Sequence, residues 1–108
     1  MFDYMTHAQS VQQIDDALTQ DFTILLLSAP WCGDCRFADM FMVEVMYNHP
    51  EINFFYVNRD DYIDFCQVLD IMGIPSFVAY KKGKEVSRFV SRFRKTKEEV
   101  EEFIASIQ

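Results

Sequence analysis

Three short apolar runs alternate along this chain with stretches of helical periodicity, and this alternation limits the folds that it can adopt. The first run, residues 22–27, carries no charged residue and includes two β-branched residues, Thr23 and Ile24. Runs of this length and composition are typical of strands that are covered on both faces. Residues 52–57 and 77–80 form the second and third runs. Such an order of strands and helices predicts an α/β domain with a mixed sheet and helices on both faces.

Helical patterns fill the intervals between these runs. The last helix is expected at Lys97–Ile107, behind a capping box formed by Thr96 and Glu99. The other predicted elements, in chain order, are a short strand at 2–5, a helix at about 7–20 behind a Thr6/Gln9 capping box, a helix from Cys32 to about Asn48, a helix opened by residues 58–60 and closed by Gly73, a turn at 82–84 and a returning strand at 85–90.

The size and charge of the chain exclude several classes of protein. A length of 108 residues fits a single domain, residues 1–108. Half of the residues are apolar, which excludes disorder as the main state. The net charge of −7 disfavours general binding to nucleic acid or to an anionic membrane. No apolar run is long enough for a membrane span, and the first residues lack a signal-peptide pattern, so we expect a cytoplasmic monomer.

Cys32 and Cys35, separated by two residues, lie where the first apolar run gives way to a helix. Free N–H groups and the helix dipole stabilise a thiolate there, and the thiolate is the nucleophile of disulfide exchange. We therefore expect Cys32 to attack a substrate disulfide and the more buried Cys35 to attack the resulting mixed disulfide. No second C-x-x-C or His pair completes a zinc site, so no metal is expected. The less favoured alternatives are that the two cysteines form half of a metal site, or that they hold an iron–sulfur cluster shared across a dimer.

Four short segments follow one another along the chain in a characteristic order. They are Ala29-Pro30-Trp31-Cys32-Gly33-Asp34-Cys35, Val57-Asn58-Arg59-Asp60 after the next strand, Gly73-Ile74-Pro75-Ser76, and the Lys82-Gly83-Lys84 turn. With these segments the chain resembles the thioredoxin family over nearly its whole length, most firmly over residues 22–107. One C-x-x-C alone is weak evidence, whereas a W-C-x-x-C about forty residues before G-I-P-[ST] is specific.

The resemblance implies a thioredoxin fold, in which a central mixed sheet of four to five strands is flanked by helices on both faces. It also implies thiol–disulfide oxidoreductase activity, with protein disulfides as substrates and a thioredoxin-reductase-type donor or a low-molecular-weight thiol as the electron source. No cofactor is then needed beyond the redox-active disulfide. Pro75 would be the family's cis-proline and would leave the Ile74 backbone free to pair with an extended substrate. The residues that shape the site would be Trp31, Gly33, Asp34, Ile74 and Pro75.

The chain departs from the family at positions around the two cysteines. Asp34 lies where the family usually has proline, and its carboxylate should disfavour a thiolate at Cys32, against the helix dipole. Leu26 and Tyr56 lie where the family has a buried Asp and its Lys partner, so apolar packing replaces that charge pair. Which effect dominates at Cys32 does not follow from the sequence, and the redox potential is left open.

Two further side chains bear on the thiol chemistry. Asp39 follows Cys35 by one helical turn, and residues at i and i+4 share a helix face, so Asp39 is a candidate proton acceptor for the resolving thiol. The alternative is an ordinary solvated carboxylate. Cys66 lies on the apolar stripe of its helix and is expected to be a buried structural cysteine, with a regulatory or resolving thiol as the alternative.

The basic residues are unevenly distributed. Eight of the ten Lys and Arg lie between residues 81 and 97, opposed only by Glu85. Basic side chains on an edge strand prevent aggregation between sheets, and this interpretation is favoured over a surface for an acidic partner. No nucleic-acid motif accompanies the charge. The alternative function for the whole chain is a binding module of thioredoxin fold, with an incidental cysteine pair and a surface built from Met40, Met42 and Met46.

Overall fold

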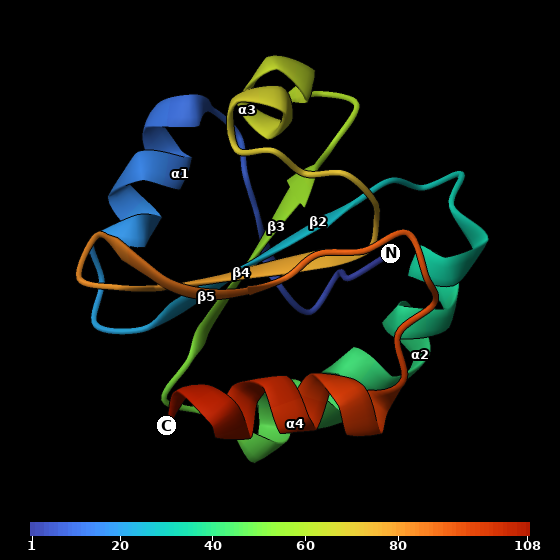
Figure 1. Ribbon diagram of the computed structural model, residues 1–108. Coiled ribbons are helices and arrows are strands. Elements are labelled where there is room, and N and C mark those ends of the chain that lie inside the picture. Colours follow the sequence, from blue (N-terminus) through green and yellow to red (C-terminus); the bar gives the residue numbers. More distant parts are fainter.

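A computed structural model describes residues 1–108 and contains one five-stranded sheet (Figure 1). The strands are β1 (Thr6–His7), β2 (Thr23–Ser28), β3 (Asn53–Asn58), β4 (Ser76–Lys81) and β5 (Lys84–Phe89), in the spatial order β1-β3-β2-β4-β5. β3 pairs in parallel with β1 and β2, whereas β4 is antiparallel to both β2 and β5. The expected mixed sheet is therefore confirmed.

Four helices cover the two faces of this sheet. α1 (Val11–Leu18) and α3 (Ile63–Val68) lie on one side, and α2 (Gly33–Asn48) and α4 (Lys97–Ile107) lie on the other (Figure 1). Successive side chains of a strand point to opposite faces. Leu26 accordingly packs in the cluster that includes α2 and α4, while Leu25 packs in the cluster of α1 and α3. This double burial explains why the central strands show no polar alternation.

The N-terminal segment differs from the sequence expectation. The strand expected at 2–5 lies instead at Thr6–His7, where Thr6 pairs with Phe55 of β3. α1 begins at Val11, and its N-cap is Ser10, whose hydroxyl accepts a hydrogen bond from the Gln13 N–H. The capping box expected at Thr6 was wrong because pairing across the sheet holds that residue in a strand. The box at the start of α4 is confirmed, with both of its hydrogen bonds present.

Three loops meet at one end of the sheet. β2 ends at Ser28 and α2 begins at Gly33, so the first loop contains the residues around Cys32. β4 runs antiparallel to β2, with Ser76 paired to Leu27, which places the loop before β4 beside the first one. β5 returns toward the same end, and residues 90–96 lead from it to α4. Each helix is too short or too polar to traverse a lipid bilayer.

Candidate active site

Cys32 caps the N-terminus of α2 with its own sulfur. Its backbone is extended, and its Sγ accepts a hydrogen bond from the Cys35 backbone N–H at 3.2 Å. The positive end of the helix dipole points at the same atom. Both cysteines are free thiols, and the Cys32 side chain remains 8% exposed. The sequence therefore predicted the position of this sulfur correctly, and the geometry suits a thiolate nucleophile.

Cys35 lies one turn deeper and is fully buried. Burial raises the pKa of the Cys35 thiol to about 12, with a smaller contribution in the same direction from Cys32. The Ser28 hydroxyl and the Ala29 backbone act in the opposite direction and lower that pKa. The Ser28 Oγ is itself buried without a hydrogen-bond partner. A thiolate at Cys35 would supply an acceptor for this hydroxyl, a feature that the sequence analysis missed.

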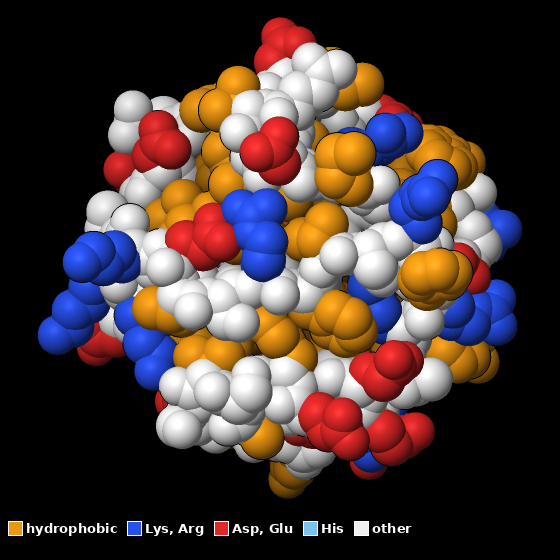
Figure 2. Space-filling model, in the orientation of Figure 1, with side chains coloured by type: hydrophobic (Ala, Val, Ile, Leu, Met, Phe, Trp, Pro, Cys, Tyr) orange, Lys and Arg blue, Asp and Glu red, His pale blue; other side chains and the backbone are white.

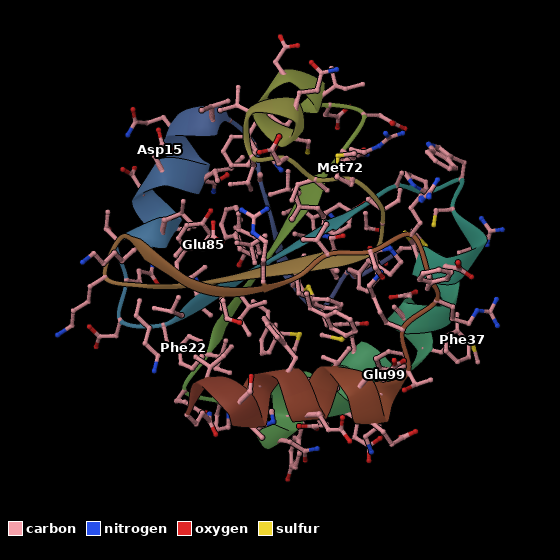
Figure 3. The ribbon with its side chains drawn as sticks, viewed as in Figure 1. Asp15, Phe22, Phe37, Met72, Glu85 and Glu99 are labelled. Atoms are coloured by element: carbon pink, nitrogen blue, oxygen red, sulfur yellow. The ribbon has the colours of Figure 1, made fainter.

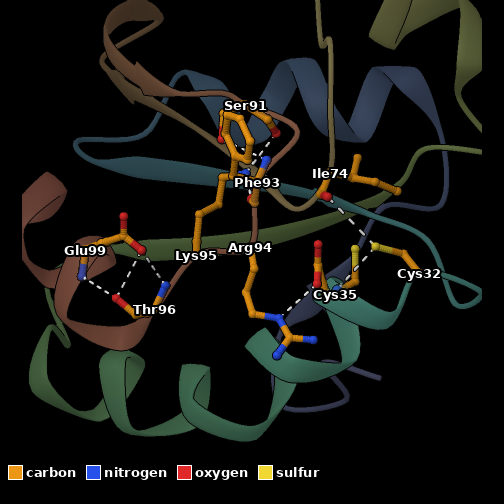
Figure 4. Close-up of polar contacts among 10 residues, drawn as sticks. Cys32, Cys35, Ile74, Ser91, Phe93, Arg94, Lys95, Thr96 and Glu99 are labelled. Atoms are coloured by element: carbon orange, nitrogen blue, oxygen red, sulfur yellow. Dashed lines mark hydrogen bonds and ion pairs between the residues drawn. The ribbon is translucent and has the colours of Figure 1, made fainter.

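The loop before β4 brings a backbone carbonyl to the nucleophile. The Cys32 thiol donates toward the Ile74 carbonyl oxygen at a distance of 3.8 Å (Figure 4). The Ile74–Pro75 peptide bond is cis, and Pro75 is buried. Gly73 holds this loop against the one after β5, because a Cβ on Gly73 would lie 2.3 Å from the Ser91 carbonyl oxygen. Only glycine allows these two backbones to approach so closely.

A pocket of about 290 Å³ opens beside the Cys32 sulfur. Its lining residues are Trp31, Cys32, Arg59, Ile71, Met72, Gly73, Ile74 and Arg92. Trp31 is 59% exposed and donates its indole N–H to Asp60 at 2.7 Å. The Arg59 guanidinium lies over the Trp31 ring, 5.3 Å from its centroid. Met72 is 75% exposed at the edge of the pocket (Figure 3). Of the residues expected to shape the site, Trp31 and Ile74 thus line this pocket, whereas Gly33, Asp34 and Pro75 lie outside the lining.

Asp34 does not act as an isolated negative charge beside the nucleophile. Its carboxylate accepts a hydrogen bond from Arg94 Nε at 2.9 Å (Figure 4). The same guanidinium lies 4.5 Å from the ring centroid of Phe37, a side chain of α2 labelled in Figure 3. The ion pair offsets the unfavourable effect that Asp34 was expected to have on a Cys32 thiolate. It also joins the α2 N-terminus to the loop after β5.

Lys95 is a buried cation that sequence reasoning did not single out. The residue is 1% exposed, and its Nζ donates to the carbonyl oxygens of Ser91 and Phe93 at 2.9 and 2.8 Å (Figure 4). Burial lowers the pKa of Lys95, whereas a thiolate at Cys35 and the carboxylate of Asp34 would raise it. Lys95 therefore fixes the loop that also carries Arg94. No signal in the sequence distinguishes it from the neighbouring surface cations.

Asp39 has partners other than the expected resolving thiol. Its carboxylate accepts hydrogen bonds from the Phe2 backbone N–H at 2.7 Å and from the Tyr4 hydroxyl at 3.1 Å. Burial and the nearby Asp39 charge raise the pKa of Tyr4, which keeps this hydroxyl a donor. The sequence expectation considered only the spacing along α2 and not the N-terminal segment that packs against it. We therefore assign Asp39 to docking of that segment, and its role as proton acceptor for Cys35 stays a prediction.

The remaining expected residues lie in the core. Leu26 is fully buried and Tyr56 is 4% exposed within the same apolar cluster, in agreement with apolar packing at these positions. Cys66 packs in the cluster on the other face of the sheet and is 2% exposed. Burial raises the pKa of Cys66 to about 11, which suits a structural thiol. No group of three or more His, Cys, Asp and Glu side chains converges on a point where it could hold a metal ion.

Comparison with sequence families gives one match that covers most of the chain. The family described as Thioredoxin matches residues 4–106. A thioredoxin of the H-type from Fagopyrum esculentum is 36% identical over 67 residues, which cover 62% of this chain and 58% of that protein. Thioredoxin-1 of Saccharomyces cerevisiae is 25% identical over 87 residues, or 80% of this chain and 84% of that protein. The matched region thus spans less than two thirds of the Fagopyrum relative.

Solved structures show the same architecture. Thioredoxin from Trypanosoma brucei brucei superimposes with a TM-score of 0.85 at 20% identity, over 95% of this chain and 89% of that one. Mitochondrial thioredoxin 3 from Saccharomyces cerevisiae, in its oxidised form, gives a TM-score of 0.82 at 17% identity over 95% of each chain. At such identities the comparison establishes the fold. It agrees with the sheet order and helix placement described above.

Proposed function

This chain belongs to the thioredoxin family, and from that premise we propose that it is a thiol–disulfide oxidoreductase that reduces or exchanges protein disulfides. The observation that carries the proposal is the Cys32 sulfur at the N-terminus of α2, where it accepts the Cys35 N–H at 3.2 Å. A thiolate is the reactive form in disulfide exchange, and this position favours it. An incidental cysteine pair in a binding module is less favoured, because such a pair needs neither this cap nor the adjoining pocket.

Two exchange steps complete the proposed reaction. In the first, the Cys32 thiolate attacks one sulfur of the substrate disulfide, forms a mixed disulfide and releases the other substrate sulfur as a thiolate. In the second, Cys35 loses its proton and attacks the Cys32 sulfur, which forms the Cys32–Cys35 disulfide and releases the second substrate thiolate. The two thiolates then take up protons from Cys35 and from solvent. The protein is left oxidised by two electrons and the substrate reduced by two.

A reductase or a low-molecular-weight thiol would restore the dithiol. The cytoplasm is the compartment that we propose, because its thiol pools keep such a pair reduced. Trp31 and the Ile74 backbone would contact the substrate around the scissile bond, since both lie in the pocket beside Cys32. Through this activity the protein would contribute to cell redox homeostasis and to electron transport.

The function is tested by redox titration together with turnover. Equilibration with glutathione buffers should convert Cys32 and Cys35 reversibly into one intramolecular disulfide, and the reduced protein should reduce insulin disulfides in the presence of dithiothreitol. The Cys32→Ser variant should lose this activity because it has no nucleophile. Wild-type protein that forms no reversible disulfide, or that leaves insulin unreduced, would show that the binding-module alternative is correct.

Ser28 provides a prediction for the second step. Its hydroxyl lowers the pKa of Cys35, so Ser28→Ala should raise that pKa further. A hydrogen bond to a charged group contributes ~1.5–3 kcal/mol, and a tenfold change corresponds to ~1.4 kcal/mol. Less Cys35 thiolate then exists at neutral pH, and release from the mixed disulfide should slow by about ten- to a hundredfold. In the wild type and in Ser28→Ala the rate of release should rise with pH. The pH profile of Ser28→Ala should be shifted to higher pH.

Rapid-mixing kinetics with a fluorescent disulfide substrate separate this step from the first. The attack by Cys32 should keep its rate in Ser28→Ala, and stability should be maintained because the lost hydroxyl has no hydrogen-bond partner. Ser87→Ala, the same substitution on β5, is the matched control. An unchanged rate of release in Ser28→Ala would mean that Cys35 loses its proton without help from Ser28.

A further inference from the structure

The pocket beside the nucleophile has a positive charge that no residue within its lining balances. Two of its eight lining residues are arginines, Arg59 and Arg92, and none is an aspartate or a glutamate. The remaining lining residues are mostly apolar and include Ile71, Met72 and Ile74. A substrate segment that enters to reach the Cys32 sulfur therefore meets two guanidinium groups and an apolar surface.

Arg92 has no partner within the protein. It is exposed, and it makes neither a hydrogen bond nor an ion pair, whereas its neighbour Arg94 is paired with Asp34 at 2.9 Å. Lys95 bonds the carbonyls of Ser91 and Phe93, and Gly73 packs against Ser91, so the backbone on either side of Arg92 is fixed. The backbone that carries Arg92 is thus fixed beside the pocket, and its unpaired guanidinium can bind a carboxylate.

Arg59 is only partly satisfied. Its one ion pair, with Asp60, is long at 3.5 Å, and its Nε is buried without a hydrogen-bond partner. Asp60 is also the acceptor of the Trp31 indole N–H at 2.7 Å, so its carboxylate is shared. The face of Arg59 rests on the Trp31 ring, which fixes its direction beside the nucleophile. Arg59 is therefore a second, oriented cation with remaining capacity for hydrogen bonds.

The distribution of basic side chains over the whole molecule also affects how a substrate approaches the pocket. Eight of the ten basic residues lie between 81 and 97, while the chain carries a net charge of −7. Figure 2 shows Lys and Arg side chains on the right-hand side of the molecule, where the N-terminal end of α2 lies in Figure 1, and also on the left-hand side, where the β4–β5 turn lies. The basic side chains near the N-terminal end of α2 add attraction for an acidic partner at this site.

We propose that the preferred substrates are polypeptides that carry aspartate or glutamate residues next to the scissile disulfide, and that Arg92 and Arg59 select them. The proposal rests on the function proposed above and adds a substrate class to it. A polypeptide is favoured over a small acidic disulfide because large apolar side chains extend beyond the pocket: Trp31, Met72 and Phe93 are 59%, 75% and 78% exposed. Such a rim suits the apolar residues of a longer chain.

The test uses three peptides with the same aryl mixed disulfide and two flanking residues that are Glu, Gln or Lys. Second-order rate constants should follow the order Glu, Gln, Lys. Each exposed ion pair changes a constant by about two- to fivefold, so the two arginines should favour the Glu peptide over the Gln peptide by about four- to twentyfold. The preference should shrink at high salt. Arg92→Gln should reduce the Glu-to-Gln ratio by about two- to fivefold, and Arg92→Glu, which leaves one positive and one negative charge in the lining, should bring the rates of the three peptides close together.

Lys84→Gln is the matched control, because it removes one exposed positive charge from the basic segment outside the pocket. The Glu-to-Gln ratio of rate constants should be unchanged in Lys84→Gln. An equal fall of this ratio in Arg92→Gln and Lys84→Gln would show only a general attraction between charges and would overturn the proposal. Equal rates for all three peptides in the wild type would overturn the substrate class while leaving the oxidoreductase intact. No reaction with any peptide would overturn both. Oxidised glutathione as good as the Glu peptide would identify a small acidic disulfide as the substrate instead.

Discussion

A Cys35→Ser variant is expected to hold its substrates on Cys32 as stable mixed disulfides. The nucleophile is retained in this variant, so the first exchange step proceeds. The second step cannot, because a buried serine hydroxyl does not ionise at neutral pH and cannot displace the substrate thiol. Trapping should therefore be stoichiometric, and turnover on disulfide substrates should be lost.

Intact-mass spectrometry after mixing with the Glu, Gln and Lys peptides measures the trapping directly. The experiment is best made in a Cys66→Ala background, which leaves one reactive thiol. Cys66 is 2% exposed and its pKa is raised to about 11, so this background should behave as the parent does. Cys32→Ser is the control and should trap nothing. Trapping on Cys35 in that control, or on Cys66 in the parent, would contradict the assignment of Cys32 as the nucleophile.

Gly73→Ala is expected to be the most damaging substitution of a residue without a reactive side chain. A Cβ there would lie 2.3 Å from the Ser91 carbonyl oxygen and 2.8 Å from the Arg92 Cα, and both are backbone atoms. Overpacking costs ~1–3 kcal/mol, and a contact with rigid backbone belongs at the upper end of that range. The melting temperature should then fall by about 10 °C or more, since ~1 kcal/mol corresponds to about 4–8 °C in a domain of this size.

The same substitution should also impair activity. To relieve the contact, the loop before β4 must move away from the loop after β5, and it carries the Ile74 carbonyl that lies 3.8 Å from Cys32. Gly33→Ala is a matched control, because its Cβ would meet only the end of the Arg36 side chain at 3.8 Å. At the first residue of α2 this change should be neutral or stabilising. Calorimetry on both variants checks the prediction, and equal melting temperatures would contradict it.

Local signals predicted those parts of the fold in which neighbours along the chain make the decisive contacts. The Thr96 and Glu99 capping box was predicted correctly because its hydrogen bonds span only three residues. The apolar runs located the central strands to within one residue, because a strand that is buried on both faces has apolar side chains at successive positions. Thr6 shows the limit of this reasoning. Its capping pattern is plausible locally, but pairing with Phe55 places it in β1.

The candidate site divides in the same way. Cys32 and Cys35 were predicted from their spacing at a strand–helix junction, and the structure places both sulfurs there. Arg94 was not predicted, because its ion pair joins residues 60 positions apart and no periodicity links them. The hydrogen bonds of Asp39 to Phe2 and Tyr4 were missed for a related reason, since a helix-face argument contains no information about the segment that packs on that helix. Contacts between loops depend on how the helices and strands pack against one another. The residue pattern of a single segment gives no information about this packing.

The hydrogen bonds of Asp39 also have a consequence for the order of folding. They join the N-terminal segment to the middle of α2 across 35 to 37 residues, and β1 pairs with a strand that follows it by about fifty. Closing long loops costs chain entropy before any contact repays it, whereas the β4–β5 hairpin and α4 depend on near neighbours. β1 can dock only on a β3 that is already in the sheet. We therefore expect the first seven residues to reach their native positions late in folding, after the sheet that they pack against has formed.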